Sequence, residues 1–324
     1  MSSRSTRAAL VKLLAVLMGF ALFAASCGDD GGGANTDNSE PDGTTAPGET
    51  QPPGTANPDV AQGEELAVDD PANAVRGGTL KIAVEAETDG LNPTANNFAT
   101  PAYIMGYPMF DPLFYVDTDG NWFPYLAESA EPIGDGSSWQ VTLRQGVKFH
   151  DGTDLNAEAL AANFEAVLND PIISLAVKPS YPETDRYEII DEYTIQYNLI
   201  RPSQYFPINL SSQLGMVASP TWLAAAADNE ALDQEPVGTG PFKFESREVG
   251  NVTKMVRNDD YWQGTDNIFL DSIEVYPITD TTIAAERVGR GELDMIVTSN
   301  PDANLTLRTW GSPPSPTSTA PRTT

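Results

Sequence analysis

The sequence predicts an α/β fold whose sheet mixes parallel and antiparallel strands. Residues 272–276, 281–288 and 293–297 read as strand, helix and strand with short links, which is a βαβ unit and requires at least one parallel pair. Residues 242–257 read as an antiparallel hairpin around Gly250 and Asn251. Both kinds of pairing are therefore expected in one chain.

The remaining elements follow from the same periodicities. Strict alternation of apolar and polar residues predicts strands at 79–85, 139–143 and 193–199, the last in a hairpin with 187–190. Asn156 is a suitable N-cap for a helix that ends at 169–171, where Asn-Asp-Pro stops it. The apolar residues of that helix share one face: Leu160, Phe164, Val167 and Leu168.

Composition excludes several functions before any motif is considered. The 324 residues contain 46 Asp and Glu against 18 Lys and Arg, a formal net charge of −28, with one Cys and one His. A single cysteine forms no intrachain disulfide, and one Cys with one His cannot make a structural zinc site. So strong a negative charge repels phosphate backbones, so no nucleic-acid partner is expected. We expect no cofactor and no metal site.

The N-terminus reads as an export signal that ends in a lipid attachment site. Arg4, Arg7 and Lys12 precede an apolar run at 13–25, which is shorter than the ~20 residues that span a bilayer. Small residues then precede Cys27, as in a bacterial lipobox, although Ala24 stands where that motif usually has Leu. The alternative is an ordinary secretory signal with an incidental cysteine. Residues 1–27 are thus predicted to be a lipoprotein signal peptide.

Two further segments are predicted to lie outside the fold. Residues 28–75 contain 8 Gly, 6 Pro and 11 acidic residues but no Lys, Arg or aromatic residue. Such a segment buries too little apolar surface to fold, and as a coil it would reach roughly 40 Å. At the other end, residues 308–324 change abruptly into a Ser/Thr/Pro-rich string. We read these two segments as an acidic tether and an aberrant tail.

The folded body, residues 76–307, resembles the extracellular solute-binding proteins of family 5, the oligopeptide- and dipeptide-binding components of bacterial ABC importers. Blocks in family order and at family spacing carry the resemblance: Gly77-Gly78-Thr79-Leu80 with Gly90-Leu91-Asn92-Pro93; Phe110-Asp111-Pro112-Leu113 with Asp119-Gly120 and Leu126-Ala127-Glu128; Arg144 to Gly152; Val237 to Phe242 with Tyr261-Trp262; and Gly291-Glu292-Leu293-Asp294. Asn92 replaces the family's usual Asp.

The resemblance implies a type II periplasmic-binding-protein fold, a clamshell of two α/β lobes that encloses the solute. This chain would contain most of lobe one, with an inserted subdomain at about 120–215, and lobe two would be largely absent. A frameshift near codon 307 and a genuine short protein with a mucin-like tail both fit the tail. Reading the other two nucleotide frames past that point distinguishes them.

Candidate ligand contacts follow from the resemblance and from the rule that ligands of α/β sheets bind beyond the carboxyl ends of strands. They lie in the loop after the first strand, next to it, and in the inserted subdomain: Asn97, Phe98, Ala99, Thr100, Tyr103, Tyr107 and Tyr181. Aromatic rings and amides suit a peptide, since they contact its backbone without demanding particular side chains. The alternative is that Phe98, Tyr103 and Tyr107 only pack against the sheet.

Other conspicuous residues are read as structural. His150 is the only imidazole, and it lies in a turn with no nucleophile in evidence. Asp111, Asp117 and Asp119 lack the spacing of an EF-hand and are read as turn and surface residues. The Gly238–Pro241 turn is not followed by the Gly-Lys-Ser/Thr of a phosphate loop.

These observations predict a binding protein and no enzyme. Its function would be to capture peptides at the outer face of the cytoplasmic membrane, on the periplasmic or cell-surface side, held there by the lipid on Cys27. Its partners would be the permease and ATPase subunits of an ABC importer. The alternative is a surface lipoprotein that has lost transport, either an adhesin or a pseudogene product.

Overall fold

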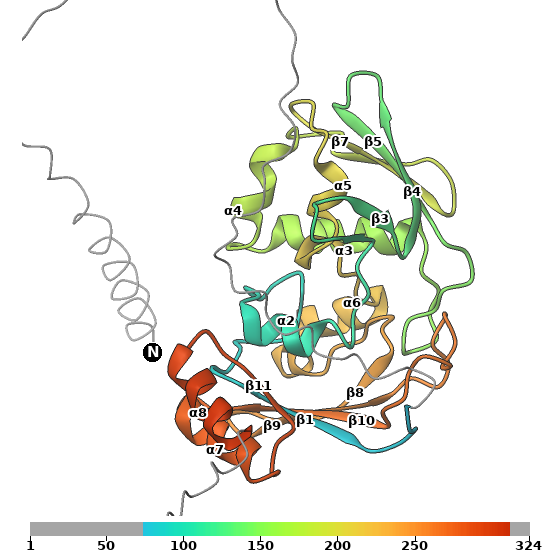
Figure 1. Cartoon of the computed structure of the whole chain (residues 1–324). Helices are drawn as coiled ribbons and strands as arrows, with labels where there is room; N and C mark the ends of the chain where they lie inside the picture. Colours follow the sequence, from blue (N-terminus) through green and yellow to red (C-terminus); the bar gives the residue numbers. More distant parts are fainter. Residues whose placement is uncertain (1–73, 312–324) are drawn as a thin grey trace, which may run out of the picture. The chain divides into compact units, whose positions relative to one another are not determined.

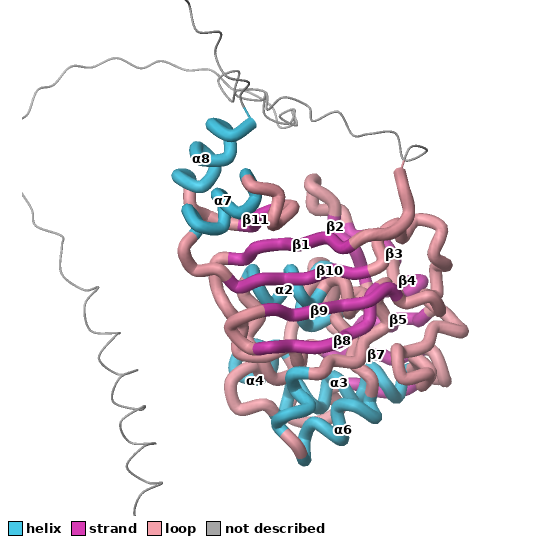
Figure 2. The backbone as a smooth tube through the Cα atoms, turned by 90° about the horizontal axis from the view of Figure 1, so that it is seen from below, coloured by secondary structure: helices cyan, strands magenta, loops and turns pink. Residues whose placement is uncertain are grey.

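A mixed five-stranded sheet contains the predicted βαβ unit. The computed structural model describes residues 74–311, so the signal peptide, nearly all of the tether and the end of the tail lie outside the described residues. The strands are β1 (Thr79–Val84), β8 (Phe242–Glu248), β9 (Val252–Arg257), β10 (Ser272–Pro277) and β11 (Met295–Val297), in the order β11-β1-β10-β9-β8. β1 pairs in parallel with β10 and β11, and β8, β9 and β10 pair antiparallel. Figure 2 shows the five strands side by side in this order. The predicted mixture of pairings is confirmed.

Helices cover both faces of this sheet. Alternate residues of β1 point to opposite faces: Ile82 and Val84 join one apolar core with α2 (Thr100–Gly106) and α6 (Pro220–Asp228), whereas Ala83 packs against α7 (Thr281–Gly289). α7 begins at Asp280, whose carboxylate accepts from two backbone N–H groups of the first turn. α8 (Pro301–Gly311) lies beside α7 (Figure 1) and extends past residue 307, where the aberrant tail is predicted to begin.

The inserted segment builds a second sheet with its own core. β4 (Ala127–Ile133), β5 (Ser138–Leu143), β6 (Tyr187–Ile189) and β7 (Thr194–Asn198) are all antiparallel, in the order β4-β5-β7-β6. α3 (Ala157–Asn169) packs the apolar face predicted for it against this sheet, and Asn156 caps it by accepting from the N–H of Ala159 at 2.9 Å. In Figure 1, α2 and α6 lie between the two sheets.

Short elements connect these layers. They are β2 (Phe114–Val116) and β3 (Trp122–Pro124), which pair as a hairpin, together with α4 (Ser174–Val177), η2 (Lys178–Ser180), α5 (Phe206–Asn209), η3 (Gln213–Gly215) and η4 (Glu230–Gln234). Within residues 74–311, no single helix has both the length and the apolar composition needed to cross a membrane. One broken pair, α3 with Ser174–Ser180, bent by 101°, meets that test by length and composition alone.

Candidate functional site

The carboxyl ends of β1, β10 and β11 meet at one edge of the main sheet, because the three strands are parallel. β1 leads to α2 on one face of the sheet, whereas its neighbour β10 leads to α7 on the opposite face. Open α/β sheets bind ligands where neighbouring strands continue to opposite faces in this way. Glu85 follows β1 at this edge. Its carboxylate accepts from the Thr298 hydroxyl and the Ser299 N–H, both at 2.9 Å. The Ser299 N–H is the largest cause that lowers the pKa of Glu85, so this carboxylate is ionised at neutral pH.

A buried arginine on β8, Arg247, holds the first residues of the loop that follows β1. The Arg247 side chain is only 2% exposed and donates to Glu87 at 2.8 Å, to the Thr88 carbonyl at 2.7 Å, and to Gln234. Burial raises the pKa of Glu87, but hydrogen bonds from the Gly250 and Thr88 N–H groups and from Arg247 outweigh it, so the net direction is down. The pair keeps the start of the candidate loop in one position.

The rest of this loop is fixed by one glutamine from the far end of the insert. The Gln213 side-chain N–H group donates to the carbonyls of Pro93 at 2.8 Å and Asn96 at 2.7 Å. Its side-chain oxygen accepts from the Phe98 N–H at 3.2 Å. The loop with the predicted ligand contacts is thus positioned by a residue more than a hundred positions later. Nothing local in the sequence indicates this contact.

The predicted contacts in and near this loop divide into exposed and packed residues. Asn97, Ala99 and Thr100 are exposed. Phe98 is buried in the main core and meets Tyr103 edge to face at 5.6 Å, and Tyr103 stacks on Tyr107 at 5.4 Å. Phe98 therefore anchors the loop in the core. Its ring is the first of a row of three that ends at the exposed ring of Tyr107.

Tyr107 is 46% exposed and borders a hollow of about 440 Å³ that also reaches Tyr115, Tyr125 and Asp111. Burial is the main cause that raises the pKa of Tyr107.

Asp111 is only 2% exposed, so its reading as a turn and surface residue is wrong. Its carboxylate accepts from Tyr261 at 3.1 Å and from the Trp262 ring N–H at 2.8 Å, among others, and burial raises its pKa. Three neutral donors, the third being the hydroxyl of Thr239, explain how a carboxylate is tolerated there.

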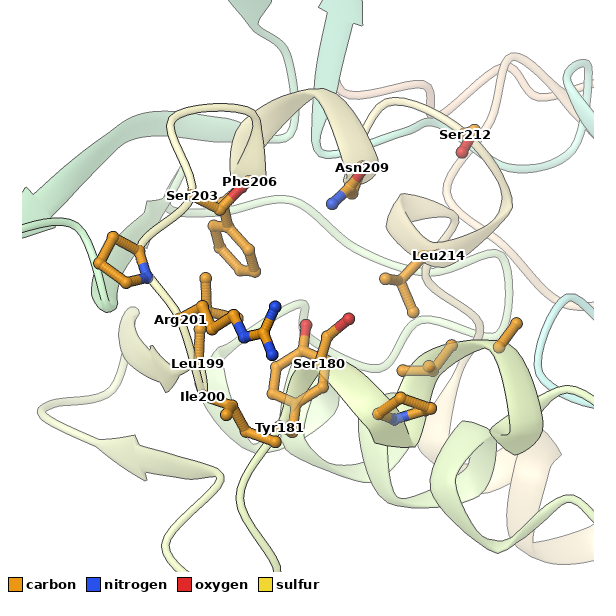
Figure 3. Close-up of a pocket in the computed structure, with 14 residues that line it drawn as sticks. Ser180, Tyr181, Leu199, Ile200, Arg201, Ser203, Phe206, Asn209, Ser212 and Leu214 are labelled. Carbon is orange, nitrogen blue, oxygen red and sulfur yellow. The ribbon is translucent and has the colours of Figure 1, made fainter.

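Tyr181 lies at a second, larger hollow of about 750 Å³ (Figure 3). The hollow is formed by the 176–181 segment on one side and the segment 199–214 on the other: Ala176, Val177, Pro179, Ser180, Tyr181, Leu199, Ile200, Arg201, Pro202, Ser203, Phe206, Asn209, Ser212 and Leu214. The ring of Tyr181 is 6% exposed and packs against Phe164 at 4.7 Å, and burial raises its pKa. Ser212 borders both hollows, so they adjoin.

Two hydrogen bonds join His150 to the glycine turn at 238–241. The imidazole Nε2–H donates to the Gly240 carbonyl at 2.9 Å, and the His150 N–H donates to the Gly238 carbonyl at 2.8 Å. Burial lowers the pKa of His150 to about 4, so the ring is neutral at neutral pH. A Cβ on Gly238 would lie 2.2 Å from the Met109 carbonyl oxygen, which explains why glycine is needed there. Among the described residues, no group of His, Cys, Asp and Glu has the geometry to hold a metal.

The described chain thus combines a mixed sheet that has a polar carboxyl edge with two adjoining hollows of ligand size between residues 107 and 241, features that suit the binding of a small solute. The chain belongs to the bacterial extracellular solute-binding proteins, family 5, whose Middle model matches residues 121–321. Members of this family bind solutes for transport and are not enzymes. The resemblance read from the sequence motifs, and the expectation of no enzymatic activity, are confirmed.

Individual relatives agree with this assignment. Di/tripeptide-binding protein 2 of Pseudomonas aeruginosa is 27% identical over 250 residues, which are 71% of this chain and 47% of the relative. The glutathione-binding protein GsiB of Salmonella typhimurium is 32% identical over 213 residues, 65% of this chain and 40% of the relative. The chain spans less than half the length of these curated relatives.

Solved structures show the same fold. OppA of Haemophilus influenzae, in complex with the peptide RPPGFSPFR, superposes with a TM-score of 0.64 at 20% identity, covering 74% of this chain and 50% of that one. AgaA of A. tumefaciens R10, in complex with agropinic acid, gives a TM-score of 0.59 at 29% identity, covering 68% and 43%. The predicted type II periplasmic-binding-protein fold is confirmed.

Proposed function

We propose that this chain supplies one wall of a peptide-binding cleft in an ABC importer's substrate-binding protein. The observation that carries the proposal is the carboxyl edge of the main sheet, where Glu85 is ionised and the loop 93–98 is clamped by Gln213. Membership of family 5 supports transport as the purpose, and relatives named for peptides and glutathione support a peptide as the solute.

The proposed mechanism involves no covalent chemistry. Peptide lies on this wall, with Asn97, Ala99 and Thr100 exposed to it and with Tyr103, Tyr107 and Tyr181 as aromatic contacts. A second lobe, corresponding to the part of the relatives that this chain does not cover, closes over the peptide, and the closed form docks on the permease. A single wall leaves the peptide half solvated, so weak binding is expected of this chain.

The proposal includes a lipid anchor at the outer face of the cytoplasmic membrane. It rests on Cys27 after the apolar run at 13–25 and on the acidic segment 28–75, which follows as a tether. An anchored binding protein samples solute near the permease without leaving the membrane surface. The anchor and the tether are read from the sequence.

The test is ligand-observed NMR on the purified chain with a pool of di- to pentapeptides and a matched pool of sugars. Saturation transfer detects weak ligands, and we expect transfer to peptides and none to sugars. Mass spectrometry of a peptide pool passed over the immobilised chain identifies the retained members. If no peptide receives saturation, the importer proposal fails and a surface lipoprotein without transport function takes its place. A submicromolar peptide affinity would contradict the single-wall mechanism.

A further inference from the structure

The large hollow has an electrostatic character opposite to that of the chain. Of its 14 lining residues none is acidic, and Arg201 is the only charged one. In a chain with 46 acidic and 18 basic residues, this absence of carboxylates sets the hollow apart from the rest of the surface. A local positive site in a negative protein attracts an anion that the remaining surface repels.

Arg201 has no partner of its own. Within the described residues its guanidinium makes no hydrogen bond and no ion pair, unlike that of Arg247, which is paired with Glu87. Figure 3 shows the guanidinium of Arg201 pointing into the hollow. Its five N–H donors form a planar fork that matches a carboxylate with two parallel hydrogen bonds.

A second donor in the same hollow is also unused. The Tyr181 ring is buried and only 6% exposed, yet its hydroxyl has no hydrogen-bond partner within the described part of the chain. The hydroxyl oxygen is not among the buried atoms that lack a partner, so it is open to the hollow, where it can donate to a ligand. Figure 3 shows the Tyr181 hydroxyl directed into the hollow.

The remaining walls suit an apolar body attached to the anion. Phe206 is buried, Leu199 and Leu214 are half-buried, and the side chain of Ile200 is exposed at the border of the hollow. Asn209 and three serines supply neutral hydrogen-bonding groups: Ser180, Ser203 and Ser212. The volume of about 750 Å³ lies within the ~300–1,000 Å³ that ligand pockets typically enclose.

We propose that this hollow is a carboxylate site, in which Arg201 and Tyr181 hold the carboxylate of a ligand whose apolar body packs on Phe206, Leu199 and Leu214. Two sources could supply such a ligand: a short apolar peptide, through its C-terminal carboxylate, and a free branched carboxylic acid. The first source rests on the proposed function, and it narrows the peptides to those with a free C-terminus and apolar side chains. The second source does not depend on it.

The test uses three probes on the full chain: trileucine, trileucine amide and 4-methylpentanoate. Dissociation constants are measured by NMR titration, since weak binding is expected. Trileucine should bind at least about tenfold more tightly than its amide, given the strength of hydrogen bonds between ions. Because the chain carries a formal net charge of −28, non-specific electrostatics favours the amide, so preference for the acid is diagnostic of a local site.

Two variants test whether Arg201 and Tyr181 cause the preference for the acid over the amide. Arg201→Gln should weaken trileucine binding about tenfold or more and abolish the preference for the acid. Tyr181→Phe should weaken it about threefold, while leaving the thermal midpoint unchanged or raised, because the hydroxyl makes no hydrogen bond in the protein that the change would break. The control is Arg186→Gln, the same charge change at a residue of the same subdomain that does not line the hollow.

The outcomes separate this inference from the peptide proposal. If trileucine and its amide bind equally and Arg201→Gln changes neither, peptide binding stands and the carboxylate site is overturned. If 4-methylpentanoate binds through Arg201 and no peptide does, the carboxylate site stands and the peptide proposal fails. No detectable binding of any probe, or an equal loss in Arg186→Gln, overturns the carboxylate site.

Discussion

Replacing the single histidine is expected to change how stability depends on pH. Burial lowers the pKa of His150 from its ordinary 6.5 to about 4, although its hydrogen bond to Gly240 opposes this. Between those two values the unfolded chain binds a proton that the folded chain does not, so acidification favours unfolding. The contribution of His150 is therefore complete above pH 6.5 and is lost as the pH falls toward 4. The loss is about 2 kcal/mol at pH 5 and about 3 kcal/mol at pH 4.

The assay is urea unfolding of the wild type and of His150→Gln at pH 7.5 and 5.0. The glutamine retains an N–H donor for Gly240 but takes up no proton, so the fall in unfolding free energy between the two pH values should be smaller by about 2 kcal/mol. Burial raises the pKa of Asp111 and gives a pH dependence of opposite sign, but both proteins contain it, so it cancels in the comparison. Because the chain has one histidine, no other imidazole contributes. Equal falls in the two proteins would refute the reasoning.

Three further predictions concern the glycine turn at 238–241, the hydrogen bonds of Gln213 and the lipid anchor at Cys27. In Gly238→Ala the new Cβ meets the Met109 carbonyl oxygen at 2.2 Å, so we expect a loss of over ~3 kcal/mol in urea unfolding, and a wild-type midpoint would contradict the close packing. Gln213→Ala removes three hydrogen bonds and should cost about 3 kcal/mol, with faster hydrogen exchange at 93–98; unchanged protection there would exclude the clamp. Cys27→Ser should move the chain from the bacterial membrane pellet to the soluble fraction, and continued sedimentation would argue against lipidation.

Elements with a strong local pattern were predictable from the sequence. The helix that starts at Asn156 forms as expected because its cap, its apolar face and its Asp-Pro stop all agree. β4 was not predictable, because Ala127–Ile133 has no clean alternation and contains Pro132. Its strand conformation comes from pairing with β5, which is a tertiary effect.

The candidate site was predictable only in part. Tyr181 was selected through the family resemblance, and the structure places it at the largest of the hollows described above; its contact with ligand is part of the proposal. The burial of Asp111 was missed because its partners Tyr261 and Trp262 lie about 150 positions away. Arg201 has no local signal at all, since a free arginine in a hollow reads in sequence like any surface arginine. Such contacts depend on the path of the whole chain.

The Gln213 clamp also sets an order of events during synthesis. The loop at 93–98 emerges from the ribosome more than a hundred residues before the side chain that fixes it. At about 5–20 residues per second, that interval lasts roughly 10 s. During it the candidate site lacks its long-range hydrogen bonds, so the geometry of the loop is acquired only after the inserted sheet has been made. At the same edge Glu85 waits longer still, for Thr298 and Ser299, so the binding edge is among the last parts of the described chain to mature, although it follows the first strand.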